Sequence, residues 1–170
     1  MPRPHKVVIG LIDPKSPSNV GAVMRAAGCY RANEVRYTGV RFARAAKYHT
    51  DTQNSASQIP LLQVEDILAP TTVPMKVVCV EFVEGASLLT QFEHPENALY
   101  VFGPEDGSIA QSVIDRADSV VYIPTTGCMN LAATVNVVLY DRLSKLAPSG
   151  HDDSAITRNR DTNNRLLINR

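Results

Sequence analysis

Short apolar runs that alternate with helical patterns are the feature that most constrains how this chain can fold. Runs rich in Val and Ile, bounded by Pro, Gly, Asp or Asn, occupy residues 6–12, 34–40, 76–82, 98–102 and 119–123. Runs of this length predict buried strands. Between several of them, apolar residues recur at helical spacing. Strands that alternate with helices predict an α/β fold with a mostly parallel sheet.

The remaining stretches predict shorter elements. We expect a strand at 61–64, a helical turn at 64–68, a loop with a short helix at 41–59, and helices after residue 19 and at 86–92, 109–117 and 131–146. Pro148-Ser149-Gly150 ends the last helix, and the polar stretch that follows predicts a flexible tail.

Composition limits the class of protein. A chain of 170 residues, 44% of them hydrophobic, is expected to form one domain with a full core. Cys29, Cys79 and Cys128 are widely spaced and form no CxxC pair, which argues against a zinc site or a disulfide framework. No apolar signal core or membrane-length run is present, so we expect a cytoplasmic protein without a membrane segment.

The charges balance, with 17 basic and 17 acidic residues. Zero net charge argues against a protein that coats nucleic acid by bulk charge. The basic residues nevertheless cluster at Arg25, Arg31, Arg36, Arg41, Arg44 and Lys47, and again at Arg158, Arg160, Arg165 and Arg170. Either a local basic patch or scattered solvated charges fits this pattern.

Three segments, at residues 13–25, 101–109 and 123–140, each lead from a predicted strand into a helix. Parallel α/β sheets bind ligands in loops at the carboxyl ends of their strands. The three segments therefore predict one shared site, although no GxGxxG or GxxxxGK[ST] fingerprint is present.

Individual residues of these segments allow two interpretations each. Gly103 and Gly107 flank a tight turn that either approaches a ligand or lies on the surface. Arg25 follows a helix N-terminus, where it either receives a phosphate or is solvated. Asn19 and Asn130 are helix caps or ligand contacts. Cys128 lacks a neighbouring base, so we expect a small packed residue.

The histidines offer no catalytic pattern. His5, His49, His94 and His151 are scattered and share no partner motif, so we expect surface residues.

Together the three segments resemble the SPOUT superfamily of RNA methyltransferases, in its SpoU or TrmH branch. The matching stretches are Ser18 to Ala27, Val101 to Ile109, and Ile123-Pro124 followed by Met129-Asn130-Leu131 and the apolar helix to Tyr140. The resemblance implies a trefoil knot in the C-terminal part of the fold, a methyltransferase domain at residues 1–147 and a tail at 148–170. It also implies a homodimer.

The resemblance further implies S-adenosylmethionine as the cofactor and transfer of its methyl group to a ribose 2′-hydroxyl. The cofactor contacts carried over by position are Gly103, Ile123, Met129, Leu131 and Glu81. Arg25 matches the arginine that assists deprotonation. An arginine pKa above about 12 makes it an awkward base, so a role in positioning phosphate and polarising the hydroxyl stays open beside it. Asn19, Glu105 and Asn130 match positions that orient the arginine or the ribose.

The substrate implied is RNA, more readily tRNA than rRNA, with Arg25, Arg41, Arg44, Arg158 and Arg160 as candidate RNA contacts. Cys128 stands where the family often has serine, and the third segment is shorter than in many members. These departures keep open a non-catalytic RNA-binding module with the same fold. A base-methylating enzyme and, more remotely, a small-molecule α/β enzyme are further alternatives.

Overall fold

The computed structural model describes residues 5–47, 59–146 and 153–168. Its centre is a sheet in which every described strand pair is parallel, in the order β3-β2-β1-β6-β4-β7-β5. The strands are β1 (Val7–Leu11), β2 (Glu34–Tyr37), β3 (Leu61–Gln63), β4 (Lys76–Val80), β5 (Ser87–Leu88), β6 (Ala98–Phe102) and β7 (Ser119–Tyr122). The α/β prediction is confirmed.

The two central strands explain why short Val- and Ile-rich runs predict this sheet so well. Every residue of β1 and β6 is buried, and the two strands pair from Val7 with Ala98 to Leu11 with Phe102. Strands covered on both faces are apolar throughout rather than alternating. The order reverses beside β1, since β2 follows on one side and β6 lies on the other. Ligands bind at such a reversal in parallel sheets.

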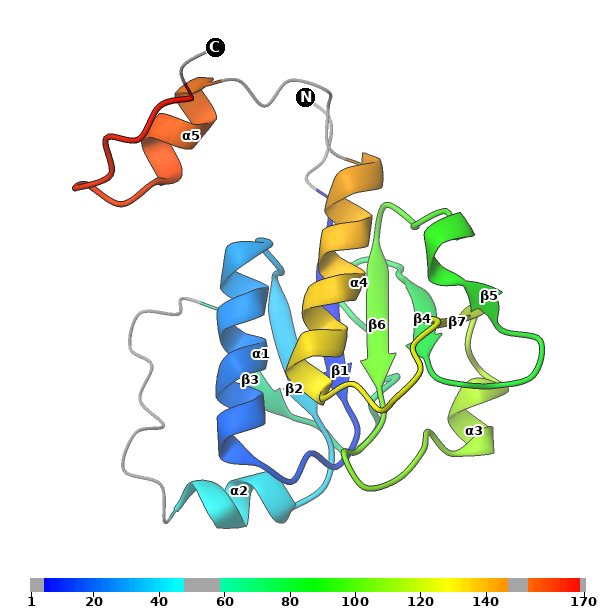
Figure 1. Cartoon of the computed structure of the whole chain (residues 1–170). Helices are drawn as coiled ribbons and strands as arrows, with labels where there is room; N and C mark the ends of the chain where they lie inside the picture. The colour runs from blue at the N-terminus through cyan, green and yellow to red at the C-terminus, as the bar shows by residue number, and fades with distance from the viewer. Residues whose placement is uncertain (1–4, 48–58, 147–152, 169–170) are drawn as a thin grey trace.

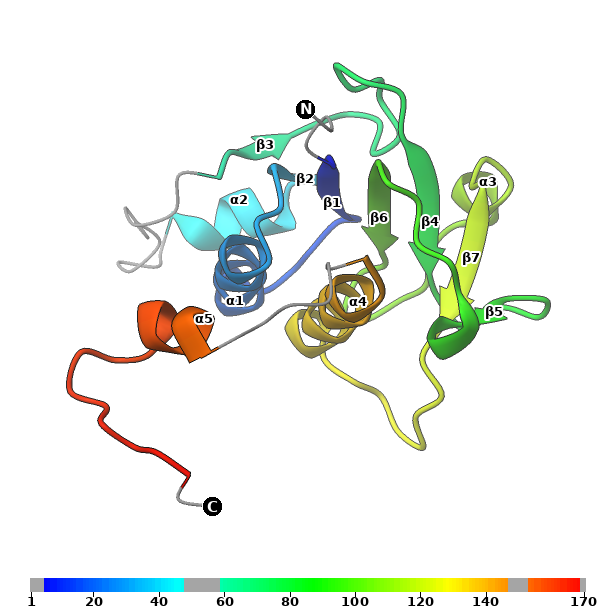
Figure 2. The same cartoon turned by 90° about the horizontal axis from the view of Figure 1, so that it is seen from above.

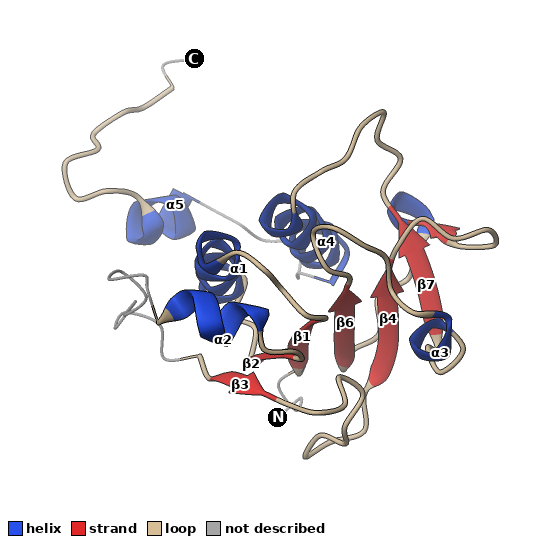
Figure 3. Ribbon diagram, turned by 90° about the horizontal axis from the view of Figure 1, so that it is seen from below, coloured by secondary structure: helices blue, strands red, loops and turns tan. Residues whose placement is uncertain are grey.

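Helices cover both faces of the sheet (Figures 2 and 3). The helices α1 (Pro17–Cys29) and α4 (Leu131–Leu146) pack side by side on one face, above the larger core cluster. The short α3 (Gln111–Ile114) lies on the other face, with the smaller cluster that contains Ile67 and Ile109. The helix α2 (Arg41–Ala46) follows β2 and contacts α1.

Three expectations about local structure are wrong. Residues 86–92 form β5 and a 3-10 turn, η1 (Leu89–Gln91), instead of a helix, because Ser87 and Leu88 pair with β7. Residues 64–68 form a bend and turn rather than a helical turn, and the helix expected at 109–117 is reduced to α3. Of the stretch 41–59, residues 48–58 lie outside the described residues.

The tail is less uniform than its polar composition predicts. It contains a helix, α5 (Asp153–Asn159), with no buried residue, and Figure 1 shows it apart from the sheet. Leu166, Leu167 and Ile168 are more than 80% exposed. The division into a domain at 1–147 and a tail at 148–170, like the trefoil knot, stays a prediction.

No helix among the described residues is long and apolar enough to cross a membrane.

Candidate functional site

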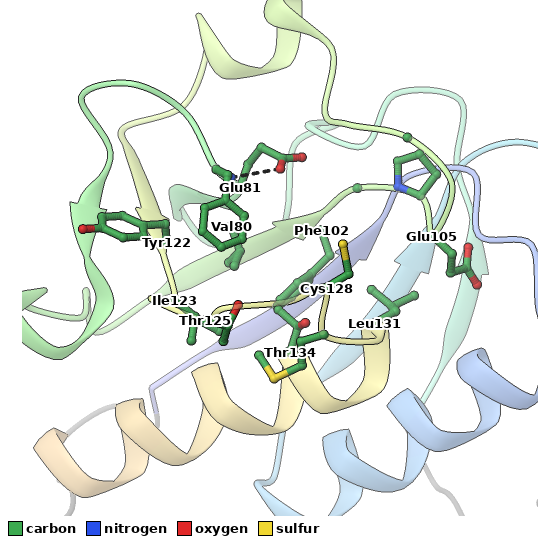
Figure 4. Close-up of a pocket in the computed structure, with 15 residues that line it drawn as sticks. Val80, Glu81, Phe102, Glu105, Tyr122, Ile123, Thr125, Cys128, Leu131 and Thr134 are labelled. Carbon is green, nitrogen blue, oxygen red and sulfur yellow. Dashed lines mark hydrogen bonds between the residues drawn. The ribbon is translucent and has the colours of Figure 1, made fainter.

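A cavity of about 210 Å³ opens where β4, β6 and β7 end and α4 begins (Figure 4). We call it the carboxyl-end cavity. It is lined by Val80, Glu81, Phe82, Phe102, Gly103, Pro104, Glu105, Gly107, Tyr122, Ile123, Thr125, Cys128, Met129, Leu131 and Thr134. The second and third segments therefore meet here, together with the loop after β4.

All five residues expected to contact a cofactor line this cavity: Gly103, Ile123, Met129, Leu131 and Glu81. They come from three loops that are adjacent only because β6, β4 and β7 are neighbours in the sheet. The second and third segments thus meet at one cavity, and its role as a functional site stays a prediction.

Glu81 ties two of these loops together. Its carboxylate accepts hydrogen bonds from the backbone N–H of Phe82, at 2.9 Å, and from that of Ile109, at 3.0 Å. Gly103 lies beside this contact, since a Cβ there would be 3.2 Å from the Ile109 nitrogen and 3.4 Å from a Glu81 oxygen. Glycine at this position lets the loop after β6 lie close against the end of β4.

The chemistry of the lining is distinctive. Most side chains are apolar or aromatic, including the Phe82–Tyr122 pair with ring centroids 6.0 Å apart. Glu81 and Glu105 are the charged residues among the described lining, which contains no Lys, Arg or His. A cavity lined by one sign of charge attracts the opposite sign. This one is suited to a ligand that carries positive charge beside a planar apolar group.

Glu105 connects the cavity to the first segment. Its carboxylate accepts hydrogen bonds from the backbone N–H of Lys15, at 2.9 Å, and of Ser16, at 3.1 Å. It also accepts one from the side-chain amide of Asn19, at 3.2 Å. Desolvation alone raises the pKa of this carboxyl, but these hydrogen bonds outweigh it and hold the pKa below its ordinary value.

The asparagines occupy different places at their helices. Ser16 is the N-cap of α1, since its hydroxyl accepts a hydrogen bond from the Asn19 N–H at 3.3 Å, so Asn19 is free to contact Glu105. Asn130 does cap α4, and its side-chain oxygen accepts from the Ala133 N–H at 2.8 Å. Their roles toward a ribose stay predictions.

Arg25 lies on the exposed side of α1, next to the buried residues Met24 and Ala26. Among the described residues its guanidinium has no hydrogen-bond or ion-pair partner, and it does not line the carboxyl-end cavity. The structure of one chain therefore leaves Arg25 available for another molecule without bringing it to the cavity.

The other candidate RNA contacts differ from one another. Arg44 is exposed on α2, and Arg158 donates to the Ser154 hydroxyl within α5. Arg160 is half-buried after α5. Arg41 is different, since its guanidinium binds Asp106 and Asp13.

Sequence reasoning missed a buried polar network. The His94 side chain is fully buried, with its ring nitrogens 2.6 Å from the Tyr100 hydroxyl and 2.8 Å from Asp141. Arg142 donates to the same hydroxyl at 3.1 Å. The expectation of a surface histidine is wrong here, because the segment before β6 passes under α4. The spacing from residue 94 to residue 141 gives no sequence signal of this contact.

The cysteines also depart from expectation. Cys128 is exposed and lines the cavity, so the expectation of a packed residue is wrong. The loop 123–130 bends away from the core, which leaves the thiol at the surface. Cys79 is buried in β4, and burial raises the pKa of its thiol to about 11.

Comparison with known proteins gives two findings. Residues 6–140 match the model of the SpoU rRNA Methylase family. A search of curated protein sequences gave no match.

Solved structures with the same fold include an AdoMet-bound rRNA methyltransferase from Sinorhizobium meliloti (TM-score 0.69, 18% identity, 86% of this chain and 59% of that one). Another is the SpoU methyltransferase AviRb from Streptomyces viridochromogenes in complex with AdoMet (TM-score 0.66, 19% identity, 84% of this chain and 58% of that one). A third comes from work on 2-OH methylation of C/U34 on tRNA (TM-score 0.66, 22% identity, 84% of this chain and 97% of that one). This chain spans under two thirds of the first two proteins. At these identities the likeness shows the fold.

Proposed function

This chain belongs to the SpoU rRNA methylase family, and from that premise we propose that it is an S-adenosylmethionine-dependent RNA methyltransferase that acts on a ribose 2′-hydroxyl. The observation that supports this most is the carboxyl-end cavity. It gathers the second and third segments, which carry the family resemblance, around an apolar space with two carboxylates.

The residues of the cavity fit this cofactor. S-adenosylmethionine bears a sulfonium cation, which Glu81 and Glu105 favour and which a Lys or Arg in the lining would oppose. The apolar and aromatic side chains suit the adenine and the methyl group. Gly103, Ile123 and Met129 line the cavity, and their backbone groups would hold the adenine. Two solved structures of this fold contain AdoMet.

When bound, the cofactor would supply a methyl group to the ribose oxygen, and the hydroxyl proton would pass to the adjacent substrate phosphate or to water. The protein's task is to orient the hydroxyl and ease the loss of that proton. Because an arginine stays protonated, Arg25 polarises the hydroxyl and binds the adjacent phosphate. Asn19, Glu105 and Asn130 keep the helix ends on either side of the site in place.

We further propose that the protein is a homodimer, in which Arg25 of one copy reaches the carboxyl-end cavity of the other. The outer side of α4 exposes Val137, Tyr140, Leu143 and Leu146, an apolar stripe at helical spacing. The neighbouring outer side of α1 exposes Gly21, Ala22 and Gly28 around Arg25. Small residues let another helix approach closely, and an apolar stripe on a helix is stabilised by burial. If a second copy packed on this face, Arg25 of the first copy would lie near the carboxyl-end cavity of the second.

The substrate we propose is RNA, either tRNA or rRNA, because solved structures of this fold include an rRNA methyltransferase and one from work on tRNA methylation. The acidic cavity repels phosphates, so the backbone of the RNA must be bound elsewhere. Arg25 and Arg44, with Arg158 and Arg160 of the tail, provide exposed or half-exposed positive charge. In this proposal residues 1–147 are the catalytic domain and residues 148–170 assist in binding RNA.

The test is transfer of labelled methyl from S-adenosylmethionine to RNA from cells that lack the protein, followed by nucleoside analysis. Wild type should form 2′-O-methylated nucleosides that resist alkaline cleavage. Arg25→Ala should lose at least about a hundredfold in rate. The matched control is Arg116→Ala, which removes an exposed arginine paired with Asp66 outside the cavity.

Two outcomes would overturn the proposal. Methylated bases next to alkali-labile linkages would show a base-methylating enzyme. Failure to bind S-adenosylmethionine at millimolar concentration would favour an RNA-binding module without catalysis, the reading motivated by Cys128 and the short third segment.

A further inference from the structure

Arg41 joins three separate segments at the rim of the site. It is the first residue of α2, and its guanidinium binds both carboxylate oxygens of Asp106, at 2.8 Å and 3.0 Å. It also donates to the backbone oxygen of Asp13 at 2.6 Å. The Arg41 Nε lies 2.9 Å from a carboxylate oxygen of Asp13, an ion-pair distance without hydrogen-bond alignment. Two guanidinium nitrogens are therefore hydrogen-bonded, and the third, Nε, lies at ion-pair distance from Asp13.

The residues bound by Arg41 adjoin those that shape the cavity. Asp106 lies between Glu105 and Gly107, which both line the carboxyl-end cavity. Asp13 precedes the turn that presents the Lys15 and Ser16 amides to Glu105. Arg41 and Glu105 thus form two separate links between the loop after β1 and the loop after β6.

The backbone around Arg41 is adapted to this arrangement. Asp13 has φ of 41°, a left-handed conformation that is uncommon for a residue with a side chain. Its N–H donates to the Thr38 hydroxyl at 3.2 Å. Gly39 has φ of 79°, and a Cβ there would lie 2.0 Å from an Asp13 carboxylate oxygen. Glycine at 39 is thus required for Asp13 to reach Arg41.

The pairing leaves Arg41 little capacity for phosphate. The hydrogen bond from Arg41 is the largest influence that holds the pKa of Asp106 below its ordinary value, so the carboxylate stays ionised and paired at neutral pH. A phosphate bound by Arg41 would have to displace Asp106 and leave two carboxylates beside it. Arg44, one turn later on α2, is exposed and has no such partners among the described residues.

We infer that Arg41 is a positioning residue of the methyl-transfer site, which holds the loops after β1 and β6 together through Asp13 and Asp106, and that it is not an RNA-phosphate contact. This replaces the role expected for Arg41 from the sequence. The inference rests on the proposed function for its effect on activity, but the link itself belongs to the fold.

The experiment compares Arg41→Met, Asp106→Asn, the double variant and the matched control Arg44→Met in the full chain. Calorimetry gives the affinity for S-adenosylmethionine, and filter binding at several salt concentrations gives the salt slope of RNA affinity. Arg41→Met and Asp106→Asn should each weaken cofactor binding about tenfold, and the double variant should be little worse than either. Arg44→Met should bind the cofactor like wild type.

The salt slope of RNA affinity shows whether Arg41 positions the loops or contacts RNA phosphate. It should be unchanged in Arg41→Met and should fall by about one in Arg44→Met. Cofactor affinity equal to wild type in Arg41→Met, together with a reduced salt slope, would overturn the inference.

Two further measurements keep the test decisive. If Arg41→Met does not fold, Arg41→Lys keeps the charge without the paired hydrogen bonds and should show the same cofactor defect. Melting temperatures of the four Arg41/Asp106 combinations report the link without cofactor or RNA. If wild type binds no S-adenosylmethionine, the proposed function fails. If the melting-temperature shifts of Arg41→Met and Asp106→Asn add up in the double variant, the link between Arg41 and Asp106 is contradicted.

Discussion

At the scale of single residues, the Glu105 carboxylate connects the start of α1 to the cavity and makes stability depend on pH. Its pKa in the folded chain lies below the ordinary value of about 4.5. A carboxyl group whose pKa is lower in the folded chain than in the unfolded chain stabilises the fold at pH values above its unfolded-state pKa. This stabilisation is lost as the pH falls through the folded-state pKa.

We therefore expect the free energy of unfolding of wild type to fall more steeply below pH ~4.5 than that of Glu105→Gln. The difference should be about 1 kcal/mol, since solvent screens a partly exposed group. Urea titrations between pH 3 and pH 7 measure it, with Glu84→Gln, an exposed residue outside the site, as control. If the free energy of unfolding fell with pH equally in wild type and in Glu105→Gln, the hydrogen-bonding role of the Glu105 carboxylate would be contradicted.

Single residues also show what the sequence could and could not reveal. Gly103, Ile123 and Met129 were identifiable because they stand in fixed positions of contiguous segments. The pairing of Arg41 with Asp106 was not, because the two residues are far apart in the chain and meet only when β2 and β6 lie on either side of β1. A basic residue in a basic stretch predicts a solvent or phosphate contact unless that neighbourhood is known.

At the scale of elements, the contact between β6 and α4 depends on a polar network inside an apolar core. His94, buried beneath α4, bonds Tyr100 of β6 and Asp141 of α4. Burial lowers its pKa below 6.5, and the positive charges of Lys145 and Arg142 act in the same direction, while Asp141 opposes them. The imidazole is therefore neutral at pH 7.

A histidine whose pKa is depressed on folding stabilises the folded chain above pH ~6.5, and this contribution is lost as the pH falls toward the folded-state pKa. We expect the stability of wild type to decline as the pH falls below ~6.5 and the decline to be weaker in His94→Gln. Chemical denaturation at several pH values measures both. An equal decline in the two proteins would show that His94 does not titrate on unfolding.

The elements themselves were largely predictable. The run at 98–102 corresponds to β6 residue for residue, because a strand buried on both faces is apolar throughout. Residues 86–92 were mispredicted because Leu88 and Leu89 fit a helical pattern equally well, and pairing of Ser87 and Leu88 with β7 decides the outcome. Tertiary contacts override local preference in such short segments.

At the scale of the whole molecule, the proposed reaction requires a second copy, because Arg25 and the carboxyl-end cavity do not meet in one chain. Tyr140→Glu places a charge in the exposed stripe of α4, where Tyr140 is 63% exposed. We expect this variant to sediment as a monomer, to bind S-adenosylmethionine and to transfer no methyl group.

Leu62→Glu, on the edge strand β3, is the matched control, since Leu62 is an exposed apolar residue away from α1 and α4. It should leave the sedimentation coefficient of wild type unchanged. A dimeric Tyr140→Glu protein would place the interface elsewhere.

The central claim, that the carboxyl-end cavity binds S-adenosylmethionine, can be tested on Cys128, which lines the cavity and is exposed. The measurement is the alkylation rate of each cysteine by iodoacetamide, followed by mass spectrometry, with and without the cofactor. Cys79 should stay unmodified because it is buried with a raised pKa. We predict that saturating S-adenosylmethionine slows modification of Cys128 at least about tenfold and leaves Cys29 unchanged. An unchanged Cys128 rate at saturating cofactor would contradict the assignment.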